Sequence, residues 1–148
     1  MNSEVNFDNQ CKETLMWVYD VAQRTTCPER EDWAFNALRA VLHAIRDRTT
    51  IEEAFHLAAQ LPVLLRGYYF EGYRPSGKKV KLNAGQFLIR IRKEMGASNE
   101  LSPEDALSAV LNVLYEHVSI GELEDVKKSM PKDIVNLWEQ EMQNSTVW

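Results

Sequence analysis

The segment from Arg66 to Arg74 carries aromatic and charged side chains that could recognise another molecule. Tyrosine and arginine are the residue types enriched at binding hot spots. The segment therefore predicts a binding surface for a partner or a ligand. A structural alternative stays open, in which the rings fill a seam between two halves of the molecule and arginine–glutamate pairs close it. The candidate surface residues are Arg66, Tyr68, Tyr69, Glu71, Tyr73 and Arg74.

Glu53 and His56 have the Glu-x-x-His spacing that places two side chains on one face of a helix. In ferritin-like bundles, two such motifs and two further glutamates bind a pair of metal ions. Glu122 and Asp125 stand at the corresponding place later in the chain. Against a metal, helix capping accounts for Glu53 and Glu122, and the helices are short for such a bundle. We therefore expect no cofactor, and Glu53 and His56 are the candidate ligands if a metal binds.

A basic stretch runs from residue 72 to residue 93 and contains no acidic residue. Such a stretch could bind an anionic partner or a phosphate, or it could be a solvated linker followed by an exposed helix face. The net charge of −5 and the pI of about 5.2 disfavour nucleic acid, and no recognition motif accompanies the basic residues. The candidate anion-binding residues are Lys78, Lys79, Lys81, Arg90 and Arg92.

The chain contains no recognisable catalytic set. It has no phosphate-binding loop, no Gly-x-Gly-x-x-Gly motif and no cysteine–histidine ligand spacing. His43 lies within an apolar helical pattern, where a lone polar residue is typically hydrogen-bonded or at the core boundary. We therefore expect no catalytic residue, and an enzymatic activity has no support in the sequence.

An internal repeat organises the chain. The segment Ala37–Leu42 recurs as Ala106–Leu111, 69 residues later, and the same offset aligns Pro62 with Pro131 and Tyr69 with Trp138. The aligned positions are those that a helical core and its helix ends require, which indicates a duplication. The sequence thus predicts one helical domain over residues 1–148, with a first repeat at 8–70, a basic linker at 71–83 and a second repeat at 84–143.

Each repeat is predicted to form four helices, because apolar residues recur at helical spacing and no segment alternates as a strand does. Thr50 with Glu53, and Ser119 with Glu122, have the spacing of a capping box at a helix start. The fold class is therefore all-α, a pseudo-symmetric bundle of two tandem repeats. The predicted helices cover 8–24, 28–48, 51–60, 62–70, 84–95, 103–117, 120–129 and 131–143.

Composition indicates an ordinary globular protein of the cytoplasm. Hydrophobic residues make up 45% and charged residues 26%, which is outside the range of disordered chains. Cys11 and Cys27 are too few for a disulfide framework, so we expect reduced thiols. The start of the chain is polar and acidic, unlike a signal peptide, and no apolar run is long enough to span a membrane.

The stretch LAAQLPVLLRGYYFEGYRP, residues 57–75, resembles the bacterial family known as domain of unknown function 2267. The second-repeat segment IGELEDV, residues 120–126, followed by Met130 and Pro131, is similar to the same family. The resemblance covers nearly the whole chain. It implies an all-helical tandem fold and carries over no activity, cofactor or catalytic residue.

Three functional hypotheses follow from these patterns. The first is a non-catalytic interaction or regulatory module with an unidentified protein partner, for which a homodimer is one option. The second is a small-ligand or metal-binding protein with chemistry of its own. The third is an anion or nucleic-acid binder that uses the basic stretch at 72–93.

Overall fold

The computed structural model describes residues 4–75 and 82–145. Within these two ranges the chain forms eight α-helices and no β-strand, which confirms the predicted all-α fold. In chain order the helices are α1 (Asp8–Gln23), α2 (Glu31–Arg48), α3 (Ile51–Ala58), α4 (Val63–Phe70), α5 (Ala84–Met95), α6 (Pro103–His117), α7 (Ile120–Lys128) and α8 (Lys132–Ser145).

The helix limits agree with the predicted ones to within a few residues, and the largest difference is at the start of α2. The sequence predicts this helix from residue 28, whereas it begins at Glu31. The backbone N–H and the hydroxyl of Thr26 both donate to the Asp105 carboxylate over 2.9 Å. These bonds hold the chain before α2 against α6, and residues 24–30 form an irregular turn instead of a helical one.

The predicted capping boxes of α3 and α7 are only half formed. The Thr50 hydroxyl accepts from the Glu53 backbone N–H over 3.2 Å, and the Ser119 hydroxyl accepts from the Glu122 backbone N–H over 3.3 Å. The return bond of a capping box would run from the glutamate carboxylate to the first residue's N–H. At α7 the side chain of Gln60 takes this place, since its Oε1 accepts from the Ser119 N–H over 2.8 Å. The glutamate carboxylates are therefore left for other contacts, which corrects the view that capping accounts for them.

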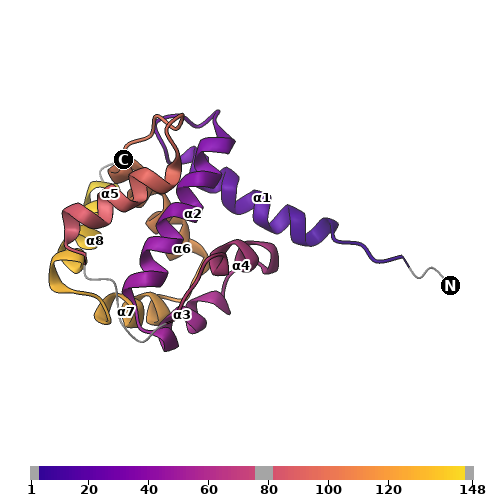
Figure 1. Ribbon diagram of the computed structural model, residues 1–148. Helices are drawn as coiled ribbons and strands as arrows, with labels where there is room; N and C mark the ends of the chain where they lie inside the picture. The colour runs from indigo at the N-terminus through magenta and orange to yellow at the C-terminus, as the bar shows by residue number, and fades with distance from the viewer. Residues whose placement is uncertain (1–3, 76–81, 146–148) are drawn as a thin grey trace.

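Helix α2 lies at the centre of the bundle and packs against α1, α5 and α6 (Figure 1). Helix α6 in turn packs against α8. Complete burial of a leucine or isoleucine side chain stabilises a fold by about 1.5–3 kcal/mol, so the contact between α2 and α6 is a main source of stability. The largest fully buried side chains of these two helices are Leu38, Leu42, Ile45, Leu107, Leu111 and Leu114.

Two pairs of helices that hold the same place in the two predicted repeats pack against each other. Helix α2 packs against α6, and α3 lies beside α7 at one end of the bundle (Figure 1). The duplication itself stays a prediction from the sequence, as do the limits of the two repeats. The arrangement matters for function because it brings residues from the two parts of the chain to one place.

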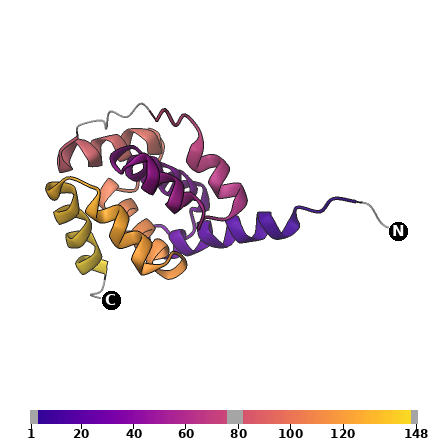
Figure 2. The same cartoon turned by 90° about the horizontal axis from the view of Figure 1, so that it is seen from below.

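Helix α1 projects from the bundle with its N-terminal half, as Figures 1 and 2 show from two directions. Its buried side packs on α2, α4 and α6 through residues such as Trp17, Val18 and Val21. Its outer side exposes three large apolar side chains, Leu15, Met16 and Tyr19.

Two further predictions from the sequence concern the cysteine thiols and membrane-spanning segments. Cys11 and Cys27 are free thiols, the first exposed and the second half-buried. Across the described ranges, no helix combines the length and the apolar character that a membrane span requires.

Candidate functional site

The predicted binding segment is divided between the core and the surface, and Tyr69 belongs to the core. Only 1% of Tyr69 is exposed, and its hydroxyl donates to the carbonyl oxygen of Ala54 over 2.8 Å. Burial raises the pKa of this hydroxyl far above its usual value. Tyr69 is therefore a structural residue that fastens α4 to α3, which corrects its place in the predicted surface.

Arg66 is also engaged inside the fold. Its Nε donates to the carbonyl oxygen of Ala58 over 2.8 Å, and its Nη2 donates to that of Leu61 over 2.9 Å. These carbonyls belong to the end of α3 and the turn that follows, where a helix leaves its last C=O groups without partners. The guanidinium thus closes the turn between α3 and α4, and its Nε and Nη2 are already engaged.

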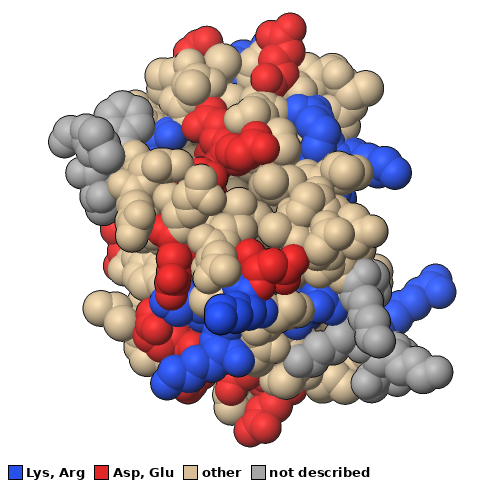
Figure 3. Space-filling model, turned by 90° about the vertical axis from the view of Figure 1, so that its left-hand side faces the viewer, with Lys and Arg blue, Asp and Glu red and all other residues tan. Residues whose placement is uncertain are grey.

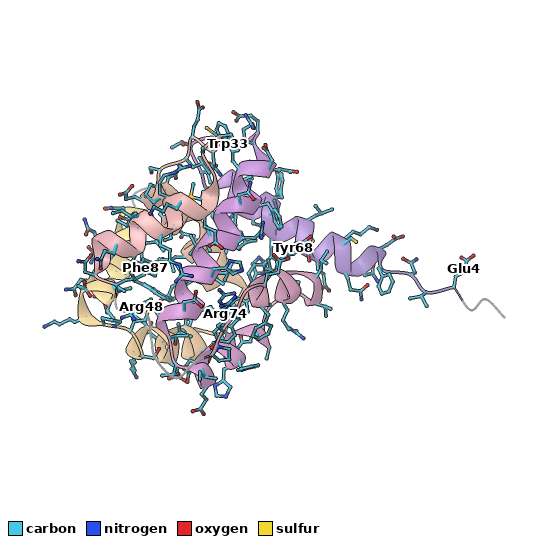
Figure 4. All side chains as sticks on the ribbon, viewed as in Figure 1. Glu4, Trp33, Arg48, Tyr68, Arg74 and Phe87 are labelled. Atoms are coloured by element: carbon cyan, nitrogen blue, oxygen red, sulfur yellow. The ribbon has the colours of Figure 1, made fainter. Side chains whose placement is uncertain are left out.

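Tyr68 and Glu71 surround one arginine of α2. Tyr68 lies where α1, α2 and α4 meet (Figure 4), and its ring meets the ring of Phe35 edge-on at 5.1 Å. The guanidinium of Arg39 lies near both rings and binds the Glu71 carboxylate over 2.9 Å. This cluster joins helices of the first half only, so it does not form the predicted seam between the two halves.

Tyr73 and Arg74 are the members of the segment closest to the predicted role. Tyr73 is half-buried and packs against Phe70 and Phe55, with centroid distances of 6.0 and 6.3 Å. Arg46 lies 5.1 Å from the centre of the Tyr73 ring. Arg74 is exposed, and Figure 4 shows it after α4 and close to α2. The segment therefore offers a small aromatic patch and a free arginine instead of a continuous surface.

The described part of the basic stretch is mostly engaged in internal bonds. Arg92 donates to the carbonyl oxygens of Leu101 and Asn99, and Arg90 binds the Asp47 carboxylate. Figure 3 shows the side of the molecule where α5 and α8 lie, and there basic side chains are interspersed with acidic ones. Arg90 and Arg92 are therefore poorly placed for an anion. The other predicted anion-binding residues, Lys78, Lys79 and Lys81, lie outside the described residues.

Glu53, His56 and Glu122 meet where α3 packs against α7. One possible ligand atom from each side chain lies within 4.8 Å of the other two. Glu53 and His56 follow each other by one turn of α3, and Nδ1 of His56 lies 3.7 Å from Oε2 of Glu53. Glu122 approaches from α7, and Asp125, its partner in the sequence pattern, is not part of the group. The structure thus unites the two predicted ligands with a third that the sequence attributes to capping.

The electrostatics of this cluster are unfavourable without a bound proton or cation. Oε2 of Glu53 and Oε1 of Glu122 are buried and have no hydrogen-bond partner among the described residues. Glu122 is only 8% exposed. Burial, followed by the nearness of the Glu53 carboxyl and by its charge, raises the pKa of Glu122 to about 7. Near neutral pH Glu122 is therefore about half protonated, and a metal ion could replace its proton.

The donor set fits a transition metal or zinc ion. Carboxylate and imidazole groups are both zinc ligands, and catalytic zinc sites combine three protein ligands with a further position for water or substrate. His56 is exposed, so its ring can turn toward an ion, while Glu122 would provide the fixed ligand. The cluster could therefore bind one divalent cation between α3 and α7.

A second group of possible ligands, Asp20, Glu116 and His117, is better explained without a metal. Arg24 binds the Glu116 carboxylate, and Asp20 accepts a hydrogen bond at 3.1 Å from His117. The His117 ring also stacks on Trp17 at 4.8 Å. Each member has a partner already, so this group is a surface ion-pair network.

His43 is hydrogen-bonded, as expected for a lone histidine in an apolar helix. Its Nε2 lies 2.7 Å from the carbonyl oxygen of Tyr68, and its Nδ1 binds the Glu94 carboxylate. It therefore connects α2 with α4 and α5 and does not line a site.

A comparison with models of known protein families identifies the family of this chain. The family model described as an uncharacterised conserved protein, DUF2267, matches residues 15–137. The chain belongs to this family. The match to DUF2267 includes the whole of α2 to α7, and so it contains both helices of the Glu53–His56–Glu122 cluster. No curated protein matches this DUF2267 chain.

Proposed function

We propose that this DUF2267 chain binds a divalent metal ion between α3 and α7. The observation that carries the proposal is the buried carboxylate of Glu122, whose Oε1 has no hydrogen-bond partner among the described residues and which lies beside Glu53 and His56. Two carboxylates this close repel each other when both are ionised. A divalent cation would neutralise both and use the unpartnered oxygens.

The ligand types favour zinc or ferrous iron over calcium and magnesium. Imidazole suits the first group, whereas calcium and magnesium prefer sites made only of oxygen ligands. The ion would join a helix from the first part of the chain to a helix from the second part. Its role would then be to stabilise or regulate the contact between α3 and α7, in a module without catalysis of its own.

Zinc binding tests this proposal directly. We expect isothermal titration of chelator-treated protein near pH 7 to show one ion per chain. Glu122→Gln and His56→Ala should each weaken binding by at least about 10-fold, because each removes one of three ligands. Release of part of a proton per ion bound is also expected, since Glu122 is about half protonated at this pH in the free protein.

Two matched variants serve as controls. Glu52→Gln changes an exposed glutamate of the same helix and should leave metal binding unchanged. His117→Ala removes the histidine of the second group and should also have no effect. The proposal is wrong if the protein takes up no ion, or if His117→Ala removes binding and Glu122→Gln does not.

A second function, a protein-interaction module, is favoured by the outer side of α1. Leu15, Met16 and Tyr19 are 60%, 61% and 52% exposed on the helix that projects from the bundle. Large apolar side chains gathered on a surface mark sites where another protein binds. A second copy of the chain is the simplest partner, because two such helices could cover each other.

Light scattering during size exclusion tests the α1 surface. We expect a dimer for the unchanged protein and a monomer for the double variant Leu15→Glu, Tyr19→Glu. The double variant should keep its helical content, because both side chains lie outside the core. The control is Glu13→Gln, which changes an exposed residue of α1 and should leave the dimer intact. A monomeric unchanged protein at high concentration would contradict self-association through this surface.

A further inference from the structure

A cleft of about 560 Å³, lined by polar side chains, opens between the end of α1, one side of α6 and the last turns of α8. Its volume lies in the range of about 300–1,000 Å³ that is typical of sites for small organic molecules. Three carboxylates line it, from Glu104 and Asp105 on α6 and from Glu141 on α8. The cleft is distinct from the α3–α7 cluster and shares no residue with it.

Glu141 is the buried member of this lining. It is 7% exposed, and within the described ranges no hydrogen bond or ion pair reaches its carboxylate, although its backbone oxygen accepts from Ser108. Burial raises the pKa of Glu141, and the charges of Glu104 and Asp105 raise it further. The Glu141 side chain is largely buried and its carboxylate has little water around it, so without a counter-ion it favours a positively charged ligand.

The guanidinium of Arg24 is engaged with other groups. Its Nη1 donates to the carbonyl oxygen of Asp20 over 2.8 Å, and its Nη2 binds the Glu116 carboxylate. Arg24 is the only lysine or arginine among the described residues of the lining. The cleft therefore keeps an excess of negative charge on its inner side.

The other polar groups of the cleft are held in place as acceptors. Oδ2 of Asp105 accepts two hydrogen bonds from Thr26, which fixes the carboxylate at the start of α6. The side-chain N–H of Asn112 donates to the carbonyl oxygen of Ser108 over 2.8 Å, so the side-chain oxygen of Asn112 is left to accept from a ligand. A ligand with several N–H donors would match this lining.

The spacing of the carboxylates indicates an extended cation instead of a single metal ion. The described residues contain two groups whose ligand atoms converge within 4.8 Å, and neither includes Glu104, Asp105 or Glu141. A metal ion needs ligands that converge on one point. A flexible chain with separated positive charges can instead reach Glu141 inside the cleft and the two α6 carboxylates at the same time.

We propose that this cleft binds an aliphatic polyamine, with one ammonium group at Glu141 and another between Glu104 and Asp105. The ammonium groups donate charge-assisted hydrogen bonds to the carboxylates, and the methylene chain between them covers the apolar part of the lining. The proposal is independent of the metal site.

Titration of the full chain with spermidine tests the proposal. We expect one spermidine per chain, and Glu141→Gln should weaken binding by about 10- to 100-fold, which corresponds to the loss of one charge-assisted hydrogen bond. Glu139→Gln is the matched control, because it removes the same charge from the exposed side of α8 and should change the affinity less than about 3-fold. Thermal unfolding of both variants checks that the fold is kept.

Three outcomes would overturn the proposal. The first is the absence of binding at millimolar spermidine. The second is equal weakening by Glu141→Gln and Glu139→Gln, which would indicate nonspecific attraction to an acidic protein. The third is displacement of spermidine by an equal concentration of magnesium, which would indicate a response to charge alone. Glu122→Gln should keep spermidine binding, so failure at the α3–α7 metal site and failure at this cleft are told apart.

Discussion

Replacing Arg46 with alanine is expected to lower the free energy of unfolding by about 3–5 kcal/mol, the size seen when one partner of a buried ion pair is removed. Arg46 is 4% exposed, and its Nη1 donates to the carbonyl oxygens of Tyr69 and Glu71 over 2.8 and 2.7 Å. Its Nε donates to the Asp47 carboxylate over 2.8 Å. Alanine would leave both carbonyls without this donor and would remove a cation that faces Asp47.

Asp47 gives a second measure of the same change. Burial by itself would raise the pKa of this carboxyl, but hydrogen bonds from Arg46 and Arg90 outweigh burial and hold the pKa below its usual value. We therefore expect the pKa of Asp47 to rise in Arg46→Ala, and carbon-detected NMR titration would show it. A carboxyl whose pKa is lowered in the native state stabilises the fold only at pH values above its pKa in the unfolded chain. Arg46→Ala should therefore destabilise the protein less at acid pH than at neutral pH.

The control for Arg46 is an arginine at the surface. Arg74→Ala removes the same atoms from an exposed position and should change the free energy of unfolding by no more than about 0.5 kcal/mol. Arg46→Lys should fall between the two, since an ammonium group cannot reproduce the planar set of donors. Urea unfolding followed by circular dichroism measures all three. Equal losses for Arg46→Ala and Arg74→Ala would show that the bonds to α4 contribute little.

The second large effect is a loss of stability with rising pH in the metal-free protein. The pKa of Glu122 is raised to about 7 from its ordinary value of 4.5, so the native state holds a proton that the unfolded chain has already released. The stabilising contribution of this proton is complete below pH 4.5, the ordinary pKa, and disappears as the pH rises through about 7. We expect the fall between these values to be on the order of 2 kcal/mol.

Glu122→Gln isolates this effect. Glutamine has nearly the same shape, carries no charge and can donate a hydrogen bond to the Glu53 carboxylate. At about pH 8 the variant should be more stable than the unchanged protein by on the order of 2 kcal/mol, and at about pH 5 the two should be nearly equal. Thermal unfolding in the presence of a chelator measures the difference, and Glu52→Gln should show no such pH dependence. A constant difference at both pH values would mean that the pKa of Glu122 is not raised in the native state.

The sequence alone determined the helices and, to within a few residues, their ends. Apolar spacing, the caps at Thr50, Ser102 and Ser119, and the prolines that precede or begin helices act within a few residues, so they can be recognised without the fold. The internal offset of 69 residues also placed Glu122 opposite Glu53 in the two predicted repeats. The family resemblance depended on local motifs in the same way, and the match over residues 15–137 confirmed it.

Only the tertiary structure decided which polar side chains are available for binding. Tyr69, Arg66 and Arg92 have the composition of a binding surface, yet each is bonded to backbone carbonyls of another segment. Glu122 is the opposite case. The sequence pattern attributes it to helix capping, whereas in the structure its carboxylate lies beside Glu53 and is available to a ligand. The burial of Glu141 could not be predicted from the sequence either, because it depends on the packing of α8 against α6. The physical reason is that a helix sets the direction of each side chain, whereas the neighbour that it meets depends on helix packing between residues far apart in the chain.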